Sequence, residues 1–289
     1  MERAAALDPV LATQAGIPGY DHELPGLSAD GFAERARLDR LTLAALDAAE
    51  ARGPGEEVAR EAMRERLGVA IECYDAGDTA SQLNVIASWV QYVRGIFDLM
   101  PADGEQAAVT IAGRMAAVPR AYQQLSQTLL GAARGERPPA RLQVEEVARQ
   151  CATWASPGES FYSGLVQRFT RVPDSLRGEL EDAAGKADAA TAELGAFLSR
   201  ELLPLAREKD ACGREVYGRA SRDFLGAAVD LDEAYAWGWE EIARLRAEQK
   251  RVSHLIQPGA TAAEAAAVLD RDPTLCTSTS PGRPGGSRP

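Results

Sequence analysis

Histidine is scarce in this chain of 289 residues, which contains only His22 and His254. A catalytic zinc site usually takes three protein ligands, among which histidine is common. Neither histidine belongs to an H-E-x-x-H motif, and neither follows a Glu by three residues, as a carboxylate-bridged bundle requires. His22 lies beside Asp21 and Glu23, but adjacent side chains rarely converge on one ion, so we interpret it as a solvated loop residue. His254 is expected near a helix end, where the helix dipole favours a cation. The sequence therefore predicts no metal ligand.

Cysteine is also rare and scattered. Cys73, Cys151, Cys212 and Cys276 form no C-x-x-C pair, which argues against a zinc knuckle or a dithiol redox site. We expect reduced, mostly buried thiols, with Cys151 and Cys212 in helices or at helix starts and no identifiable base beside them. The chain also lacks G-x-S-x-G, G-x-x-x-x-G-K-[ST] and a G-x-G-x-x-G that follows a strand. The sequence therefore predicts no catalytic and no cofactor-binding residue.

An excess of basic residues is missing. The chain has 32 Lys and Arg against 43 Asp and Glu, a net charge of −11, so it does not offer the cations that a nucleic acid needs. Its first residues have no basic segment followed by an apolar one, and no apolar stretch is long enough to span a bilayer. We therefore expect a cytoplasmic protein that binds neither nucleic acid nor membrane.

Helical signals fill the rest of the chain. We predict an all-α fold, an irregular multi-helix array, with an irregular segment through residue 27 and helices thereafter. Ser28 is placed to cap the first helix, which Gly53-Pro54-Gly55 should end, and Pro119 suits the first turn of a helix that closes at Gly135. Asp230…Glu233 and Thr261…Glu264 have the spacing of capping boxes. No segment of note alternates with period two, so strands are not expected.

The aromatic group Tyr235, Trp237 and Trp239 lies within one predicted helix. Helical spacing prevents all three side chains from facing one direction. We expect one or two of them in the core rather than in contact with a ligand.

The last residues differ from everything before them. From Cys276 to Pro289 the sequence CTSTSPGRPGGSRP has no acidic residue and no hydrophobic period, and its Pro and Gly break helix and strand. We predict a helical region over residues 1–275 and a disordered tail over residues 276–289. We interpret the tail as a reading frame lost in a GC-rich gene; the alternative is an ordinary disordered C-terminus.

Three blocks resemble a known family. They are LDPVLATQAGIPGYDHELPGLSADG near the N-terminus, RMAAVPRAYQQLSQTLLGAARG in the middle, and GREVYGRASRDFLGAAVDLDEAYAWGWEEIARLRAEQ further on. The third block carries the family's pattern at Gly213, Tyr217, Leu225, Gly226, Leu231, Glu233, Tyr235 and Gly238. Together, from about Leu7 to Pro273, they resemble bacterial domain-of-unknown-function family 885, whose members look like helical zinc metallopeptidases.

The resemblance implies zinc-assisted amide hydrolysis in full-length relatives, with a peptide as substrate. The family's H-E-x-x-P-G-H-type motif belongs to a C-terminal half that is absent from this sequence, so no zinc ligand is carried over to any residue. We therefore expect the N-terminal half of a metallopeptidase-like fold, which supplies scaffold and one wall of a cleft and is catalytically inactive. The alternatives are a non-enzymatic helical interaction module and, less favoured, a bundle that sequesters a small molecule between its helices.

The half-fold interpretation has a consequence for stability. Apolar stripes of the Pro173–Leu203 and Tyr235–Leu255 segments would lack their cover. We therefore expect a marginally stable chain that self-associates and binds a hydrophobic dye.

Overall fold

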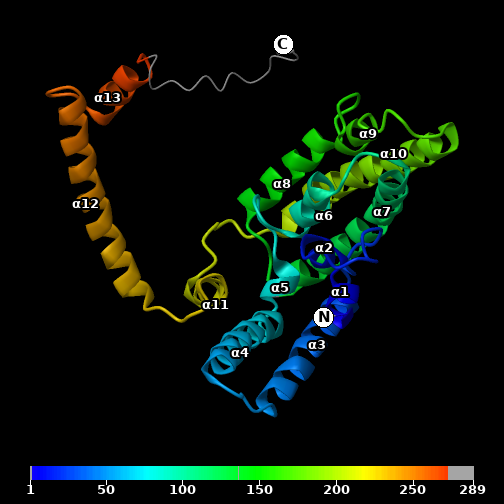
Figure 1. The fold of residues 1–289 in the computed structure, drawn as a ribbon, viewed down its shortest axis with the longest axis horizontal. Helices are drawn as coiled ribbons and strands as arrows, with labels where there is room; N and C mark the ends of the chain where they lie inside the picture. The colour runs from blue at the N-terminus through cyan, green and yellow to red at the C-terminus, as the bar shows by residue number, and fades with distance from the viewer. Residues whose placement is uncertain (1, 136, 273–289) are drawn as a thin grey trace. The chain divides into compact units, whose positions relative to one another are not determined.

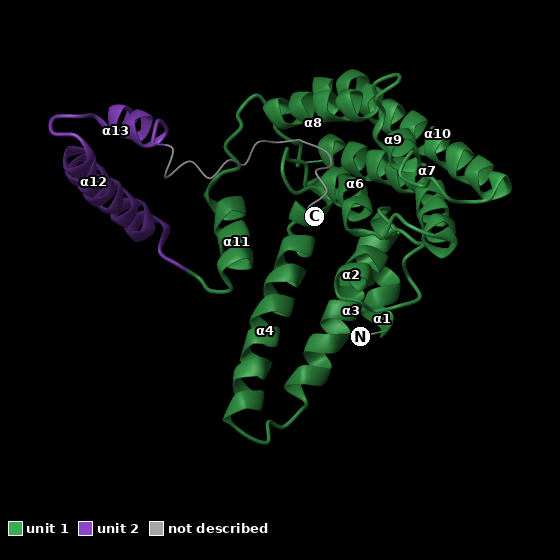
Figure 2. Ribbon diagram, turned by 45° about the horizontal axis from the view of Figure 1, so that its top comes forward, with its two compact units in different colours: residues 1–228 green, residues 229–289 purple. Residues whose placement is uncertain are grey.

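The computed structural model describes residues 2–135 and 137–272, and the regular structure within them is helical (Figure 1). No β-strand occurs in these residues; an isolated bridge pairs Ala140 with Arg207. The predicted all-α fold is therefore confirmed. The contacts divide the chain into unit 1, residues 1–228, and unit 2, residues 229–289 (Figure 2). The predicted tail, residues 276–289, lies outside the described residues.

The N-terminal segment is more helical than predicted. Two short helices, α1 (Glu2–Leu7) and α2 (Pro9–Gln14), precede the irregular residues 15–28. Helix α2 forms because Pro9 occupies its first turn and the Asp8 carboxylate accepts a hydrogen bond from the Leu11 amide at 3.0 Å. The prediction of an irregular segment through residue 27 is thus wrong for these two helices and holds for residues 15–27.

Helices α3 (Ala29–Asp47) and α4 (Pro54–Asp75) form a hairpin, and the one-turn α5 (Asp78–Ser81) comes after them (Figure 1). Ser28 caps α3 as predicted, with its hydroxyl accepting from the Gly31 amide at 3.2 Å. Helix α3 ends earlier than expected, at Asp47. Pro54 does not end it but begins α4, where a proline without an N–H group is tolerated.

Helices α6 (Trp89–Leu99), α7 (Glu105–Arg134), α8 (Arg141–Trp154), α9 (Phe161–Val166) and α10 (Asp174–Phe197) make up the rest of the unit 1 core. The prediction for Pro119 is wrong, because α7 is one helix of 30 residues with Pro119 inside it. Proline forfeits the hydrogen bond to the Met115 carbonyl four residues back. The turns before it nevertheless bury Ile111, Met115 and Val118, and this packing offsets the lost bond.

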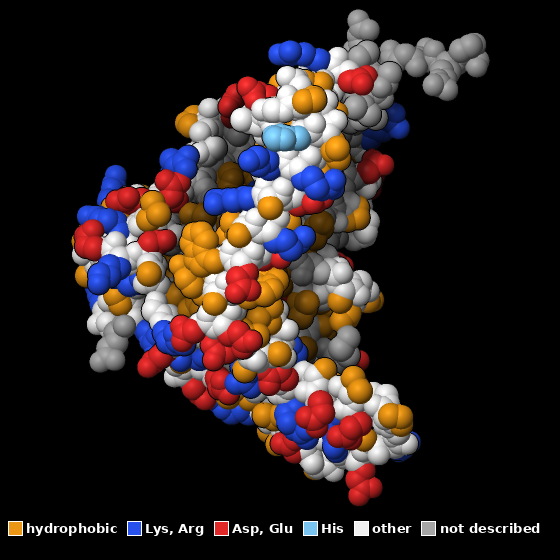
Figure 3. Space-filling view, turned by 90° about the vertical axis from the view of Figure 1, so that its left-hand side faces the viewer, with side chains coloured by type: hydrophobic (Ala, Val, Ile, Leu, Met, Phe, Trp, Pro, Cys, Tyr) orange, Lys and Arg blue, Asp and Glu red, His pale blue; other side chains and the backbone are white. Residues whose placement is uncertain are grey.

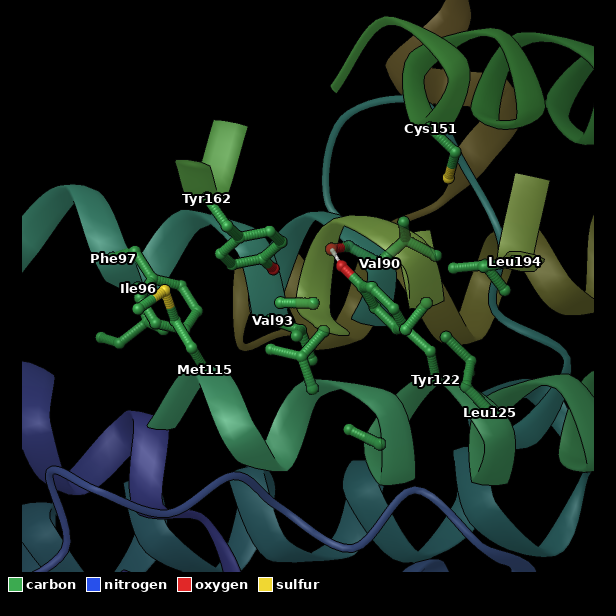
Figure 4. Close-up of a cluster of buried hydrophobic side chains, with 14 of the residues drawn as sticks. Val90, Val93, Ile96, Phe97, Met115, Tyr122, Leu125, Cys151, Tyr162 and Leu194 are labelled. Atoms are coloured by element: carbon green, nitrogen blue, oxygen red, sulfur yellow. Dashed lines mark hydrogen bonds between the residues drawn. The ribbon is translucent and has the colours of Figure 1, made fainter. Parts of the chain in front are cut away.

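The core of unit 1 lies where α6, α7, α8 and α10 converge (Figure 4). Val90 and Phe97 of α6 pack there, and the Tyr122 hydroxyl donates to the Val90 carbonyl at 3.3 Å. Helix α10 is covered by α7, α8 and α9. Its buried face comprises Leu176, Leu180, Ala183, Ala184, Ala187, Ala190 and Leu194. The expected uncovered stripe on the Pro173–Leu203 segment is therefore wrong, because unit 1 itself supplies the cover.

A π-helical turn, η1 (Leu198–Leu202), and a short 3-10 turn, η2 (Leu203–Leu205), end this layer, and α11 (Arg214–Leu225) completes unit 1. Unit 2 contains α12 (Leu231–Ile256) and α13 (Ala262–Leu269). Thr261 and Glu264 form the predicted capping box of α13, and the Asp230 carboxylate caps α12. Within the described residues, none of the helices has both the length and the apolar composition to cross a membrane.

Candidate functional site

The two histidines belong to different units. His22 lies in a loop of unit 1 with its Nε2 atom 3.5 Å from the Glu23 carboxylate, and His254 lies in the last turn of α12. Across residues 2–135 and 137–272, no three His, Cys, Asp or Glu side chains gather as a group that could hold a metal ion. The zinc implied by the family resemblance therefore does not fit the donors of this part of the chain.

The cysteines differ in their surroundings. Cys151 is buried in α8, and burial raises the pKa of its thiol to about 12. Cys73 is half-buried, and burial also raises its pKa, so both thiols stay protonated and unreactive near neutral pH. Cys212 is exposed, which contradicts the expectation of mostly buried thiols, because it lies in the non-helical segment before α11. Cys276 lies outside the described residues.

Unit 1 contains a pocket of about 720 Å³. Its walls come from α4, α5, the loop over residues 82–86, the segment between α7 and α8, the segment before α11, and α11 itself. The polar groups that line it include Asp78, Gln82, Asn84, Arg137, Gln143, Arg207 and Asp210.

Most of these polar groups are already bonded to one another or to the loop. Gln143 accepts from the Val85 amide at 3.2 Å and donates to Asp210 at 3.0 Å. Asp78 accepts from Arg137 at 3.1 Å and from Arg219 at 3.2 Å. The pocket's polar side chains thus hold its walls together, and this arrangement favours a structural over a ligand-binding role.

Arg114 of α7 is a second buried polar feature, and its role was not predicted from the sequence. Its guanidinium donates to the Glu23 carbonyl at 2.9 Å, the Thr13 hydroxyl at 2.8 Å and the Tyr20 carbonyl at 3.0 Å. Burial lowers its pKa to about 10, so it remains charged at neutral pH. The signal was present, since Arg114 opens the R-M-A-A-V-P block and loops without regular structure leave carbonyls to satisfy. Arg114 anchors the N-terminal segment to α7.

Helix α12 carries the largest exposed aromatic side chains of unit 2. Tyr235 is 69% exposed, Trp237 62% and Trp239 54%, so the expectation that one or two of them lie in the core is wrong. The physical reason is the small size of unit 2. Its other described helix, α13, has eight residues and buries little beyond Ser253 of α12 and its own Ala265.

The exposed apolar residues of α12 recur at helical spacing. We call Tyr235, Trp239, Ile242, Leu245 and Val252 the α12 stripe. The rings of Tyr235 and Trp239 meet edge to face with centroids 6.2 Å apart. Trp237 is separated from Trp239 by about 200° of helical rotation and so faces away from the stripe. The face drawn in Figure 3 shows hydrophobic side chains at the surface among charged ones.

Charges are distributed unevenly along α12. Its first turn is acidic, with Asp230 as cap and then Asp232 and Glu233. Further on, Glu241 pairs with Arg244 at 2.6 Å and Glu248 pairs with Arg251 at 2.6 Å. Two cations of the second half, Arg246 and Lys250, take part in no ion pair within the described residues.

Comparison with known proteins identifies the family. None of the curated proteins compared with the chain matches it. A family model described as a bacterial protein of unknown function, DUF885, matches residues 9–283 and so covers nearly the whole chain, including all but the first two residues of the three blocks that resemble this family. The chain therefore belongs to bacterial domain-of-unknown-function family 885.

Proposed function

We propose that this chain is a helical scaffold of metallopeptidase-like ancestry that does not itself hold catalytic zinc, and that its α12 stripe binds another polypeptide. The observation that carries the proposal is the exposure of five large apolar side chains along one side of a single helix. Exposed apolar surface of this kind marks interaction sites in soluble proteins. Membership of the family supports the ancestry, and the donor set of the described residues supports the lack of a zinc site.

The shape of the stripe favours a polypeptide over a small molecule. It runs from Tyr235 to Val252, roughly 25 Å along the helix at about 1.5 Å per residue. A helix surface is convex, whereas small ligands are bound in concave pockets. A second helix laid along the stripe fits this surface, because apolar side chains at intervals of three and four residues are what helix pairing requires.

The same proposal covers the expected partners and location. In a full-length relative with a zinc motif, this region would form scaffold and one wall of the cleft that binds a peptide substrate. A cytoplasmic location is a further part of the proposal and rests on the sequence alone.

A self-contained interaction module is the second candidate, and one observation favours it. Unit 1 closes its own core: Leu180, Ala184 and Leu198 of the α10 layer are completely buried without any further chain. A region that depended on a missing half would leave such a layer open. The interaction-module hypothesis therefore predicts a sharp, cooperative thermal unfolding transition and a defined complex. The half-fold hypothesis predicts a broad unfolding transition.

The zinc content of the purified full chain tests the proposal that this chain does not hold catalytic zinc. After dialysis against a weak chelator, we expect far less than one zinc per chain and no peptide hydrolysis when zinc is restored. One equivalent of retained zinc together with hydrolysis that tracks zinc content would overturn the proposal.

A further inference from the structure

We propose that α12 pairs with α12 of a second copy of this chain, antiparallel, as a two-stranded coiled coil centred near Trp239. The inference rests on the interaction surface of the proposed function and names its occupant. Three features of α12 support the proposal: the spacing of its apolar residues, the distribution of its charges, and the position of Gly238 beside Trp239.

The spacing is that of a heptad. Nonpolar residues recur along the helix at alternating intervals of four and three positions, and Gln249 is the one polar residue in the series. The series is Leu231, Tyr235, Gly238, Ile242, Leu245, Gln249 and Val252. A period of 3.5 residues keeps one seam facing a partner helix over its whole length. The long helices α7, α8 and α10 pack within unit 1, whereas the seam of α12 is exposed at Tyr235, Ile242, Leu245 and Val252.

The charges favour an antiparallel arrangement. The acidic first turn, Asp230, Asp232 and Glu233, lies at one end of α12, and the cations Arg246 and Lys250 lie towards the other. An antiparallel second copy brings these opposite charges together twice, whereas a parallel copy sets like charges side by side. Antiparallel helices also align their dipoles favourably.

The same residues determine the register. With the two-fold axis near Trp239, Arg246 lies across from Asp232 of the second copy, and Tyr235 lies across from Leu245. The Trp239 side chains of the two copies then meet at the centre. Gly238 has no heavy atom within 4 Å of the position that a Cβ would occupy, so it leaves room for Ile242 of the second copy.

The flanking acids on the other edge do not oppose this pairing. Glu241 and Glu248 are held by Arg244 and Arg251 of the same helix. The hydrogen bonds from the arginines lower the pKa of both carboxyl groups, and the pairs carry little net charge. The surface is therefore self-complementary, as an isologous two-fold interface must be.

Sedimentation equilibrium of the full chain, over a tenfold range of concentration, tests the partner. We expect species of twice the 30.8 kDa chain mass. Trp239→Glu should raise the dissociation constant at least about tenfold, because it sets two carboxylates against each other at the two-fold axis, directly beside the seam. Trp237→Glu is the matched control: it changes the same residue type at similar exposure on the opposite side of α12, and the dissociation constant should stay within about twofold.

Cysteine cross-linking tests the orientation, in a background with Cys73, Cys212 and Cys276 replaced by Ser. A mixture of Tyr235→Cys and Leu245→Cys chains should form a disulfide-linked heterodimer on mild oxidation, whereas Tyr235→Cys alone should not cross-link. Cross-linking of Tyr235→Cys with itself would indicate parallel helices and overturn the proposal. A dimer that is equally stable with Trp239→Glu would place the interface elsewhere, with the same consequence.

The remaining outcome is that the protein is a monomer. Binding of a hydrophobic dye then shows whether the α12 stripe is exposed or covered in that monomer. A monomer that binds a hydrophobic dye, with the dye lost in Trp239→Glu, refutes the second copy and leaves the stripe free for another polypeptide. A monomer without dye binding refutes both this inference and the proposed interaction surface, because the stripe is then covered within its own chain.

Discussion

Arg114 is the residue on which the N-terminal segment of unit 1 depends. Its donors satisfy the carbonyls of Tyr20 and Glu23, in a stretch that has no helix or strand to do so. The Thr13 hydroxyl accepts from Arg114 and donates in turn to Asp21 at 2.7 Å, which brings a counter-charge close to the buried guanidinium. A buried charge is stable only when paired and bonded in this way.

We predict that Arg114→Met destabilises the protein by about 3 kcal/mol, because the partly buried carbonyls of Tyr20 and Glu23 lose their donor and Asp21 loses the nearby positive charge. Urea denaturation followed by circular dichroism measures the change. Arg120→Met on the exposed side of the same helix is the control and should stay within about 0.5 kcal/mol of the parent. Equal effects of the two substitutions would show that Arg114 contributes only its aliphatic packing.

Two glycines of α10 give a prediction of opposite sign. Gly185 is exposed and a Cβ there meets no atom within 4 Å, so Gly185→Ala should stabilise by about 0.5–1 kcal/mol through the lower entropy of the unfolded chain. Gly195 packs against α8, and a Cβ there would lie 3.1 Å from the Cys151 Cβ atom, so Gly195→Ala should destabilise. The melting temperatures test both predictions: that of Gly185→Ala should rise and that of Gly195→Ala should fall relative to the parent protein. Stabilisation by Gly195→Ala would mean that α8 and α10 have room between them.

Sequence-based prediction of single residues succeeded where the determining contact is local. Ser28 and Thr261 cap their helices because the partner amide lies three residues away. It failed for Trp239, whose exposure depends on which other segment is present to cover it. It also missed Arg114, whose oxygen partners lie about ninety residues or more away along the chain.

At the scale of elements, α11 is unusual because it has no buried residue. It is joined to α4 by ion pairs: Arg222 bonds Glu72 at 2.8 Å and Glu65 at 2.8 Å, and Arg66 of α4 bonds Asp223 at 3.0 Å. Arg219 adds a bond to Asp78 of α5. Its large apolar residues, Tyr217, Phe224 and Leu225, are exposed. Electrostatics rather than packing therefore keeps α11 in place.

We predict that salt and acid release α11 before the rest of unit 1 unfolds. The hydrogen bond from Arg222 lowers the pKa of Glu65, so the pair stabilises the docked helix at neutral pH. The stabilisation is lost as the pH falls below the usual carboxyl value and through that lowered pKa. Salt screens such partly exposed pairs. The protection factors of the α11 amides, which compare each measured exchange rate with the intrinsic rate at the same pH and salt, should fall in 1 M salt or at pH 3–4, while those of α7 stay unchanged.

Arg222→Gln should lower the same protection factors at neutral pH and low salt. Arg244→Gln is its control, because Arg244 bonds only Glu241 of its own helix among the described residues and joins no two elements. Exchange in α11 that is insensitive to salt, acid and Arg222→Gln alike would mean that packing holds the helix.

The presence of the longer helices was predictable from hydrophobic periodicity and from capping, glycine and proline residues, but the ends of the helices were not. Pro119 would end a helix in isolation, and α7 continues through it because both of its halves are buried. Helices α1, α2 and α9 have six residues each, which is too few for a helical hydrophobic period to be recognised in the sequence. For the candidate site, two isolated histidines and scattered cysteines lead to the prediction of no zinc site, which stays a prediction. The pocket of unit 1 could not be predicted, because it arises from segments far apart in the chain.

For the whole molecule, the two units differ in how much of their stability is internal. Unit 1 has a continuous buried core from Val10 to Leu202. Unit 2 buries only Ser253, Ala260 and Ala265 within its described residues. Most of the stability of a protein helix comes from tertiary packing of its apolar face, and α12 has little of it within unit 2. The predicted marginal stability therefore belongs to unit 2, and the α12 stripe is the surface from which self-association and dye binding should arise.

We predict that protection of the α12 amides from hydrogen exchange depends on protein concentration, whereas protection of α7 and α10 does not. Association stabilises a folded element by mass action, so α12 should exchange quickly in dilute solution and more slowly as the second copy binds. Exchange measured by mass spectrometry on the full chain, at several concentrations, resolves the helices separately. Trp239→Glu should abolish the concentration dependence and Trp237→Glu should preserve it, since only Trp239 lies against the second copy in the proposed pairing. If α12 is instead protected as strongly as α7 at every concentration, its stability comes from within one chain, and pairing between copies has no part in it.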